Sequence, residues 1–269
     1  MQLKVTTWNI NSVRLRIDQV GRALDEIAPD ILCLQETKCP GDCFPLKVLQ
    51  GFGYPHVVEL GQKGYNGVAI LSRFPFASVE PRDWCERRDA RHIAAVLGPE
   101  AGAAAGIAIH DFYVPAGGDV PDTGLNPKFD HKLRFLGEMR AWAAGRESRP
   151  AILVGDLNVA PLEHDVWSHK QLLDVVSHTP VETALLEDLR REGRFVDAAR
   201  RLTPEPAKIY TWWSYRSPDW AAANKGRRLD HVWLSDDLAD TLRSVDIHAA
   251  ARSWLRPSDH VPATATLEL

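Results

Sequence analysis

Several apolar segments of this chain follow one another with no helical pattern between them, and this succession restricts the folds that the chain can form. Each segment is short and rich in β-branched or small apolar residues, which is typical of β-strands. A strictly alternating βαβ sheet needs a helix between successive strands, so it fits poorly. We expect two packed β-sheets with helices on the outside. The segments are residues 67–71, 92–97, 107–114, 210–213, 229–234, 245–249 and 263–267.

The remaining elements combine further strands with helical patterns. Apolar residues recur at helical spacing between Asp18 and Ala28, and Pro29 would end this helix. The sequence Thr179-Pro180-Val181-Glu182 is typical of a helix start, because threonine can cap, proline suits the first turn and glutamate can reach back to the cap amide. That helix is expected to end at Gly193. The other expected elements are strands over residues 3–10, 30–35 and 151–154 and a helix over residues 127–144, which gives three or four helices in all.

The length and composition fit one domain over residues 1–269. No linker, charge block or low-complexity run marks a boundary. The net charge of −4 argues against non-specific nucleic-acid binding by the whole surface, but it allows a local basic face beside an acidic metal site. No apolar run approaches the ~20 residues of a membrane span, and no signal-peptide pattern opens the sequence. The four cysteines form no CxxC pair, so we expect reduced thiols and a cytoplasmic protein.

Polar residues with metal-binding and acid–base chemistry occur where several expected strands end. Each block alone is typical of a turn or a strand-end cap. Together the blocks offer three acids, amides and a histidine, which can bind a hard divalent cation and cleave a phosphate ester with water. Magnesium keeps several waters, so one or two protein carboxylates suffice. The blocks are Trp8-Asn9, Gln35-Glu36, Gly155-Asp156-Leu157-Asn158 and Ser258-Asp259-His260.

The histidine of this set needs an orienting acid if it is to donate to a phosphate oxygen. His260 lies between two prolines, and its alternative role is a loop histidine bonded to a backbone carbonyl. Asp230 is the candidate acid that would hold its ring. Tyr113, at the exit of the 107–114 strand, could donate to the same phosphate, although a strand-end tyrosine is more often structural.

Aromatic and basic residues alternate in the segment that precedes Asp230. Aromatic rings among cations suit stacking on sugars or bases beside a phosphate track. The alternative is a tryptophan-rich core strand, and by alternation either Trp212 or Trp213 should face inward. The segment contains Trp212, Trp213, Tyr215, Arg216, Trp220, Lys225, Arg227 and Arg228.

The ordered set of motifs resembles the exonuclease III family of apurinic/apyrimidinic (AP) endonucleases, in the endonuclease/exonuclease/phosphatase superfamily. Single motifs are weakly specific, but the ordered set spans nearly the whole chain. The matching stretches are residues 8–14, 34–38, 61–68, 113–115, 155–158, 210–216, 228–230 and 258–260.

The resemblance implies an α/β (α+β) fold of the DNase I-like kind, a four-layer sandwich of two packed mixed β-sheets flanked by helices. It implies Mg²⁺ or Mn²⁺, with Glu36 as the main ligand and Asp156 as the residue that aligns and deprotonates water. The implied catalytic residues are Tyr113, Asp156, Asn158, Asp230 and His260. The implied metal-site residues are Glu36, Asn9, Asn11, Asp259, Asp156 and Asn158. The residues expected to bind DNA or the abasic sugar are Arg14, Lys38, Asn66, Arg91, Lys128, Trp212, Trp213, Trp220, Arg227 and Leu229.

The function that follows is hydrolysis of the phosphodiester 5′ to an abasic site in double-stranded DNA, in base excision repair. A 3′–5′ exonuclease or 3′-end cleaning activity is expected to share the site. The protein is expected to be a monomer with no obligate protein partner, associated with the nucleoid through DNA. Ala116 and the long 119–129 loop depart from the family pattern and bear on the balance of activities. The alternatives are a phosphoesterase acting on another substrate and a non-catalytic DNA-binding relative.

Overall fold

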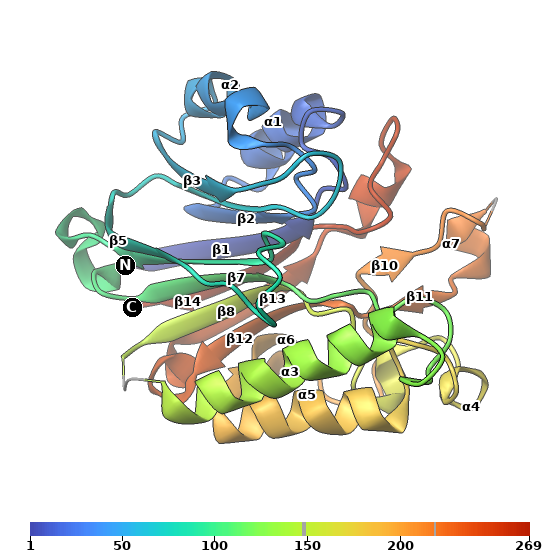
Figure 1. Cartoon of the computed structure of the whole chain (residues 1–269). Coiled ribbons are helices and arrows are strands. Elements are labelled where there is room, and N and C mark those ends of the chain that lie inside the picture. Colours follow the sequence, from blue (N-terminus) through green and yellow to red (C-terminus); the bar gives the residue numbers. More distant parts are fainter. Residues whose placement is uncertain (147–148, 218) are drawn as a thin grey trace.

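Two β-sheets pack face to face at the centre of the protein, and helices cover both outer faces (Figure 1). The computed structural model describes residues 1–146, 149–217 and 219–269. Its strands are β1 (Gln2–Asn9), β2 (Ile31–Gln35), β3 (His56–Leu60), β4 (Val68–Ser72), β5 (Phe76–Pro81), β6 (His92–Leu97), β7 (Ala108–Tyr113), β8 (Ala151–Asp156), β9 (Phe195–Asp197), β10 (Trp212–Trp213), β11 (Gly226–Arg227), β12 (Asp230–Ser235), β13 (Leu242–Ile247) and β14 (Ala263–Glu268). Its α-helices are α1 (Ile17–Glu26), α2 (Leu46–Gly51), α3 (Pro127–Gly145), α4 (His169–Leu172), α5 (Pro180–Glu192), α6 (Ala198–Leu202) and α7 (Trp220–Ala223).

The two main sheets are both mixed. The first has the strand order β13-β14-β1-β2-β4-β3, and the second has the order β5-β6-β7-β8-β12-β9. The pairs β1–β2 and β7–β8 are parallel, and the other pairs are antiparallel. This arrangement confirms the expected four-layer sandwich.

Three apolar clusters hold the layers together, because the central strands bury side chains on both of their faces. Leu3, Val5 and their neighbours fill the space between the sheets with residues such as Ile152 and Val154 of β8. A second cluster joins β7, β8 and β12 to α3 and α5. A third joins β1, β2 and β4 to α1 and α2. The central strands are therefore covered from both sides, as their long apolar runs predicted.

Several elements differ from the sequence-based prediction. The expected strand over 210–213 shortens to β10, which pairs only with β11 in a separate two-stranded sheet. The expected strand over 245–249 begins earlier, at Leu242, and ends at Ile247. The edge strands β3 and β5 were missed, because they are half-buried or exposed and carry little apolar signal. The described residues contain seven α-helices rather than three or four, because α2, α4, α6 and α7 are too short to show helical periodicity.

Other predictions from the sequence are confirmed. In α5, Glu182 accepts a hydrogen bond from the backbone N–H of Thr179, the predicted cap contact. The four cysteines are free thiols. No helix in the described part of the chain is long and apolar enough to cross a membrane.

Candidate active site

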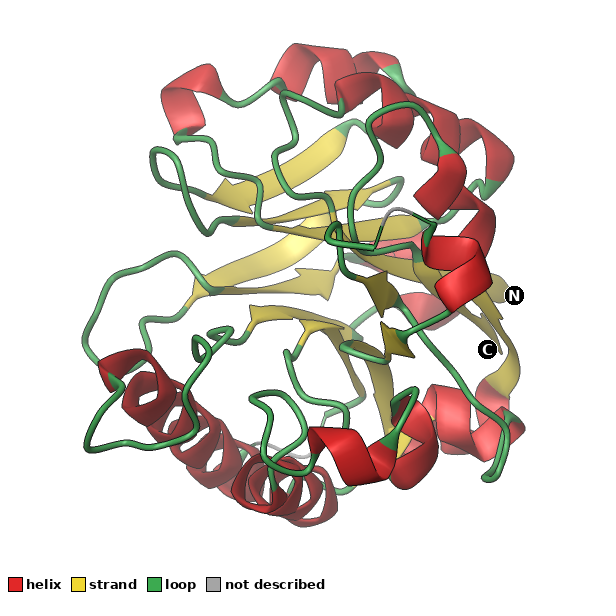
Figure 2. Ribbon diagram, turned by 90° about the vertical axis from the view of Figure 1, so that its right-hand side faces the viewer, coloured by secondary structure: helices red, strands yellow, loops and turns green. Residues whose placement is uncertain are grey.

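The predicted functional residues meet at one end of the sandwich, which faces the viewer in Figure 2. Strand register brings them there. Asn9 at the end of β1 lies beside Gln35 at the end of β2, and Tyr113 at the end of β7 lies beside Asp156 at the end of β8. Because β12 runs antiparallel to β8, its first residue, Asp230, pairs with Asp156. The ends of β1, β2, β7 and β8 and the start of β12 therefore lie at the same end of the sandwich.

Strand alternation aims these side chains into the space between the sheets. In β8, Ile152 and Val154 belong to the core between the sheets, so Asp156 follows on the same face. In β1, Leu3 and Val5 face that core, and the same two-residue period brings Asn9 to it. The chemistry therefore begins where the apolar layer between the sheets ends.

A cleft of about 770 Å³ opens at this end of the sheets. Its walls include Glu36, Asp156 and His260, three residues that were predicted to act together. Other predicted residues on its walls are Tyr113, Asn158, Trp212, Trp213, Trp220, Arg227, Leu229 and Asp259.

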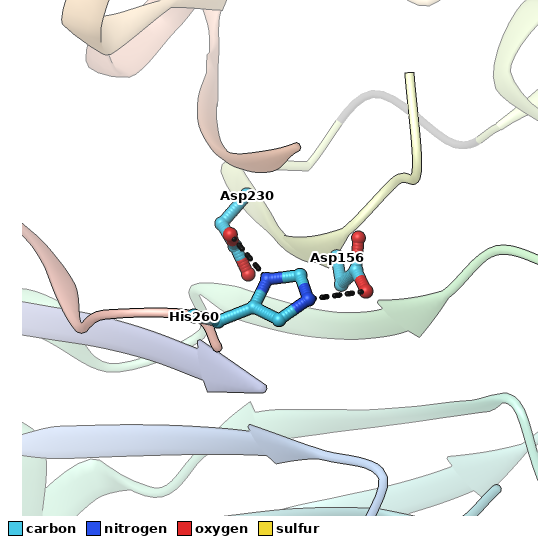
Figure 3. Close-up of side chains that lie close together, drawn as sticks. All are labelled: Asp156, Asp230 and His260. Carbon is cyan, nitrogen blue, oxygen red and sulfur yellow. Dashed lines mark hydrogen bonds and ion pairs between the residues drawn. The ribbon is translucent and has the colours of Figure 1, made fainter. Parts of the chain in front are cut away.

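His260 lies between two buried carboxylates (Figure 3). Its Nδ1 is 2.8 Å from Asp230 Oδ2, and its Nε2 is 3.6 Å from Asp156 Oδ2. The predicted pairing of His260 with Asp230 is present. Burial alone would lower the pKa of His260, but Asp230 and Asp156 outweigh it and raise the pKa to about 10. The two carboxylates therefore favour the protonated ring, whose Nδ1 donates to Asp230 while Nε2 faces Asp156 beyond hydrogen-bond distance.

Asp156 is the most constrained acid of the site. Burial raises its pKa to about 7, although the positive charge of His260 opposes the rise. Its Oδ2 accepts from Asn9 Nδ2 at 2.9 Å, and its Oδ1 accepts from the backbone N–H of Asn158 at 2.9 Å. A carboxyl group with this pKa can exchange a proton near neutral pH, which suits a general base.

The substitution Asp230→Asn tests the charge balance around His260. The Asp230 carboxylate is the charge that raises the pKa of His260 most. Without it, the effect of burial should dominate, and the pKa of His260 should fall well below about 10. Protonation of His260 stabilises the fold fully below pH 6.5, its ordinary pKa, and this stabilisation fades as the pH rises to about 10. The loss of stability relative to wild type should therefore be largest below pH 6.5. A ¹⁵N-histidine NMR titration measures the pKa, and an unchanged titration of His260 would contradict the assignment.

Glu36 lies opposite this triad on the wall formed by the first sheet. Its Oε1 accepts from Asn9 Nδ2 at 3.0 Å and from the hydroxyl of Tyr113 at 2.8 Å. Although burial opposes ionisation, Lys38, Asn9 and Tyr113 lower the pKa of Glu36. Burial, Glu36 and Asp156 raise the pKa of Tyr113 well above its ordinary value, so its hydroxyl stays a donor. Glu36 is thus an anion aimed into the cleft.

The oxygen donors around Glu36 fit a hard cation. Lys38 Nζ lies 2.6 Å from both Glu36 Oε2 and Asn11 Oδ1, so these two oxygens already converge on one positive charge. Asp259 is adjacent, because Asn11 Nδ2 donates to its Oδ1 at 3.2 Å. Oxygen ligands of this kind suit Mg²⁺ or Mn²⁺. The set of Asp156, Asp230 and His260 is also close enough to hold a metal, but the 2.8 Å hydrogen bond between His260 Nδ1 and Asp230 Oδ2 fits a hydrogen-bonded triad.

Asn9, which was predicted among the metal-site residues, links the two acids of the site. Its amide nitrogen donates to both Glu36 and Asp156, while its oxygen accepts from the backbone N–H of Asn11 at 3.1 Å. The side chain is fully buried. In this arrangement Asn9 holds the two acids at a fixed separation, and its place in the metal site stays a prediction.

The turn after β8 places Asn158 beside Asp156. Gly155 has a φ of +142°, and a Cβ there would lie 1.9 Å from the carbonyl oxygen of Phe112, so only glycine allows β7 and β8 to approach in this way. Asn158 has a φ of +53°, which asparagine tolerates better than most residues. Its amide donates to Val114 O at 2.9 Å and to Asp156 Oδ2 at 3.2 Å.

The aromatic wall of the cleft comes from the small sheet and its flanks. Trp212 is half-buried and donates from Nε1 to Asp259 Oδ2 at 3.0 Å. The guanidinium of Arg227 lies 5.3 Å from the centre of its ring. Trp213 is buried and packs against Trp220 at 5.0 Å between ring centres. Trp213 is thus the inward-facing member of the pair, as alternation predicted.

Five residues predicted to contact DNA do not line this cleft: Arg14, Lys38, Asn66, Arg91 and Lys128. Arg14 and Lys128 are exposed, so they remain available as rim contacts. Asn66 and Arg91 make contacts within the protein, and their role in DNA binding stays a prediction. Asn66 is buried and donates to the carbonyl of Asp89, while the Arg91 guanidinium pairs with the Asp89 carboxylate and lies 4.8 Å from the centre of the Tyr113 ring.

The sequence analysis missed a second group of cleft residues. Trp167, Val176 and Ser177 line the wall opposite the first sheet, and Lys225 lies 4.5 Å from the ring centre of Trp167. Trp167, Val176 and Ser177 lie between β8 and α5, where no periodic pattern marks them. Only the aromatic-with-cation signal at Trp167 could have pointed to this wall.

Comparison with known proteins agrees with the geometry. The model of the endonuclease/exonuclease/phosphatase family matches residues 6–260. The exodeoxyribonuclease III of Haemophilus influenzae is 30% identical over 273 residues, which cover 98% of this chain and 99% of that protein.

Solved structures give the same relationship. An AP endonuclease from Archaeoglobus fulgidus has a TM-score of 0.90 and 32% sequence identity, with 99% of this chain and 100% of that chain covered. The 3′ phosphatase NExo from Neisseria, bound to a product DNA hairpin, has a TM-score of 0.89 and 32% identity with the same coverage. The chain belongs to the endonuclease/exonuclease/phosphatase family, in the group formed by exodeoxyribonuclease III and its AP endonuclease relatives.

Proposed function

We propose that this protein is a metal-dependent DNA repair nuclease that hydrolyses the phosphodiester 5′ to an abasic site in duplex DNA. The products would be a 3′-hydroxyl and a 5′-deoxyribose phosphate. The observation that carries the proposal is a single cleft that combines a buried acid–histidine–acid triad, a carboxylate near the amide oxygen of Asn11 and an aromatic wall with a cation stacked on it.

The proposed chemistry assigns one task to each polar group. Asp156 takes the proton of the attacking water, and Asn158, bonded to Asp156, orients that water. His260, held by Asp230, donates from Nε2 to a non-bridging oxygen of the phosphate. The neutral hydroxyl of Tyr113 is a second donor. Donors fixed in advance around developing negative charge are a large source of rate acceleration.

A divalent cation beside Glu36, with Asn11 and Asp259 near it, would neutralise charge on the phosphate and on the leaving oxygen. The contacts of Glu36 and Asn11 with Lys38 support this location, because they gather two oxygen donors around one positive charge. We propose Mg²⁺ or Mn²⁺ as that cation.

The aromatic wall supports the choice of substrate. A sugar without a base is compact and partly apolar, and Trp212 and Leu229 offer an apolar surface next to the triad. Arg227 and Lys225 place positive charge beside the rings, as a nearby phosphate backbone requires. Arg14 and Lys128 would contact DNA outside the cleft.

A 3′–5′ exonuclease or 3′-end cleaning activity belongs to the same proposal. Both require a terminal phosphate ester to reach the same triad. At 32% identity this chain is as similar to the AP endonuclease of Archaeoglobus fulgidus as to the 3′ phosphatase of Neisseria. We also propose that the protein acts as a monomer, needs no obligate protein partner and works in the cytoplasm at the nucleoid.

A labelled duplex with one abasic analogue tests the proposal. Nicking 5′ to the analogue, dependent on Mg²⁺ or Mn²⁺ and stopped by chelator, is expected. A duplex ending in a 3′-phosphate, assayed in parallel, ranks the two activities. Release of phosphate from inositol phosphates without nicking would overturn the DNA assignment. Binding that persists in chelator, with no nicking after Mg²⁺ is restored, would indicate a non-catalytic relative.

Glu36→Gln tests the metal site. Loss of the anionic ligand should raise the Mg²⁺ concentration for half-maximal nicking by at least about 10-fold, because ligands and their supports each contribute about 10–100-fold to metal affinity. Mn²⁺ binding followed by EPR measures the same loss without substrate. Glu163→Gln, at an exposed glutamate, is the matched control. An unchanged Mg²⁺ requirement would remove Glu36 from the site.

A further inference from the structure

We propose that the buried ion pair of Lys132 and Glu182 is a positioning device that fixes three loops of the cleft and thereby the place of Asn158. Lys132 lies on α3 and Glu182 in the first turn of α5. Neither residue touches the reacting atoms in this account. The inference rests on the proposed nuclease function, and it names residues to which that function assigned no task.

Both charged side chains are withdrawn from solvent. The side chains of Lys132 and Glu182 have 0% relative exposure, and Lys132 Nζ pairs with Glu182 Oε1. Burying two charges is costly, and well-packed apolar residues often serve stability as well or better. An ion pair at such a place therefore calls for a task beyond holding two helices together. Arg140 and Glu192 already join the same helices at the surface, with 2.6 Å between Nη2 and Oε1.

Lys132 also donates hydrogen bonds to two backbone carbonyls beside the cleft. Its ammonium donates to Asn158 O at 2.7 Å and to Ala116 O at 3.4 Å. With Glu182 these contacts use the three donors of the group. The loop after β7 and the loop after β8 are thus tied to one buried atom.

Glu182 binds the third loop. It accepts from the backbone N–H of Ser177 at 3.0 Å with each oxygen, and from the backbone N–H of Thr179 at 3.2 Å. Ser177 lines the cleft, and its hydroxyl accepts from Arg227 Nη1 at 2.7 Å. The ion pair therefore connects the triad side of the cleft with its cationic aromatic wall.

Gly117 packs closely against Lys132 and Val176. Its φ is +88°, and a Cβ at this position would lie 2.8 Å from Lys132 Cδ and 2.9 Å from Val176 Cγ1. The loop after β7 therefore lies directly on the Lys132 stem and on the loop before α5. This close approach accounts for the glycine at position 117.

Asn158 is held through both its backbone and its side chain. Its carbonyl is held by Lys132, while its side chain and its N–H are bonded to Asp156. Without Lys132, the turn can shift and carry the water-orienting amide away from Asp156. A displacement of about 1 Å at a reacting group can cost about 10²-fold in rate.

Two variants separate positioning from stability. Lys132→Met alone leaves the Glu182 charge buried and unpaired, so both the melting temperature and the rate should fall. The double variant Lys132→Met/Glu182→Gln removes that charge and keeps an oxygen for the N–H groups of Ser177 and Thr179. We expect it to recover most of the melting temperature, while kcat on abasic duplex stays about 10–100-fold below wild type with KM within about 3-fold. Arg140→Met, at the exposed pair between the same helices, should keep the wild-type kcat.

A spectroscopic readout keeps the test independent of activity. The side-chain amide signals of Asn158, in ¹⁵N-asparagine-labelled protein, should move in the double variant and stay in place in Arg140→Met. A double variant with restored stability, wild-type kcat and unmoved Asn158 signals would overturn the positioning role. If wild-type protein nicks no DNA, the proposed function fails, and the Asn158 signals still decide whether the ion pair positions the turn. Lys132→Arg, which keeps a donor, should retain more of the rate than Lys132→Met.

Discussion

Asp156→Asn is expected to lower the rate of nicking at an abasic site by at least about 100-fold, because removal of a general base typically costs about 10²–10⁴-fold. The substitution keeps the shape of the side chain, and its one amide oxygen can accept from Asn9 or from Asn158, which both donate to Asp156. It removes the group that can accept a proton from water near neutral pH. Single-turnover cleavage of a labelled duplex at saturating enzyme measures the effect free of product release.

Asp111→Asn is the matched control for this variant. Asp111 is also a fully buried acid between the sheets, and it accepts from Gln35 Nε2 at 2.6 Å. Burial raises its pKa well above the ordinary value, and an asparagine keeps an oxygen that can accept from Gln35. We expect near wild-type cleavage. Wild-type turnover in Asp156→Asn would remove Asp156 from the role of base.

His260→Ala is expected to lose at least about 100-fold in cleavage rate for a different reason. The variant removes a preorganised cationic donor to the phosphate, and loss of one such donor costs about 10²–10³-fold in related reactions. It also leaves the fully buried Asp230 carboxylate without its partner, which should destabilise the fold by about 3–5 kcal/mol. The rate is therefore measured well below the melting temperature, with circular dichroism to verify folding.

Two further variants separate these effects. His260→Gln keeps a donor with a similar reach and no charge, so its rate should lie between those of wild type and His260→Ala. His248→Asn replaces a half-buried histidine bonded to Thr264 Oγ1 at 2.9 Å and should cleave normally. If His260→Ala stays folded and cleaves at the wild-type rate, His260 has no role in phosphate binding.

The location of the site could be predicted because it follows from strand periodicity. Apolar residues alternate towards the core up to the ends of β1 and β8, and Asn9 and Asp156 continue that alternation. The pairing of His260 with Asp230 was expected from the need of a phosphate-binding histidine for an orienting acid and from the family resemblance, and the structure contains it.

Other features depend on backbone conformations or tertiary contacts that no local pattern encodes. Glu36 follows a strand but adopts a φ of +51°, which turns its carboxylate into the cleft. Lys132 lies in an amphipathic helix, where a lysine is expected at the surface, yet it is buried. Arg91 was predicted to contact DNA, and its pairing with Asp89 and its position over the Tyr113 ring could not be read from the sequence.

The central claim is that strand ends far apart in the sequence form one pocket that holds a divalent cation next to the phosphate-binding triad. Anomalous X-ray diffraction from crystals soaked in Mn²⁺ tests it most directly. We predict a peak at coordination distance from the Glu36 carboxylate, on the side of Asn11 and Asp259, with the Lys38 ammonium displaced. Strong Mn²⁺ binding elsewhere in the molecule, with no peak beside Glu36, would contradict the claim.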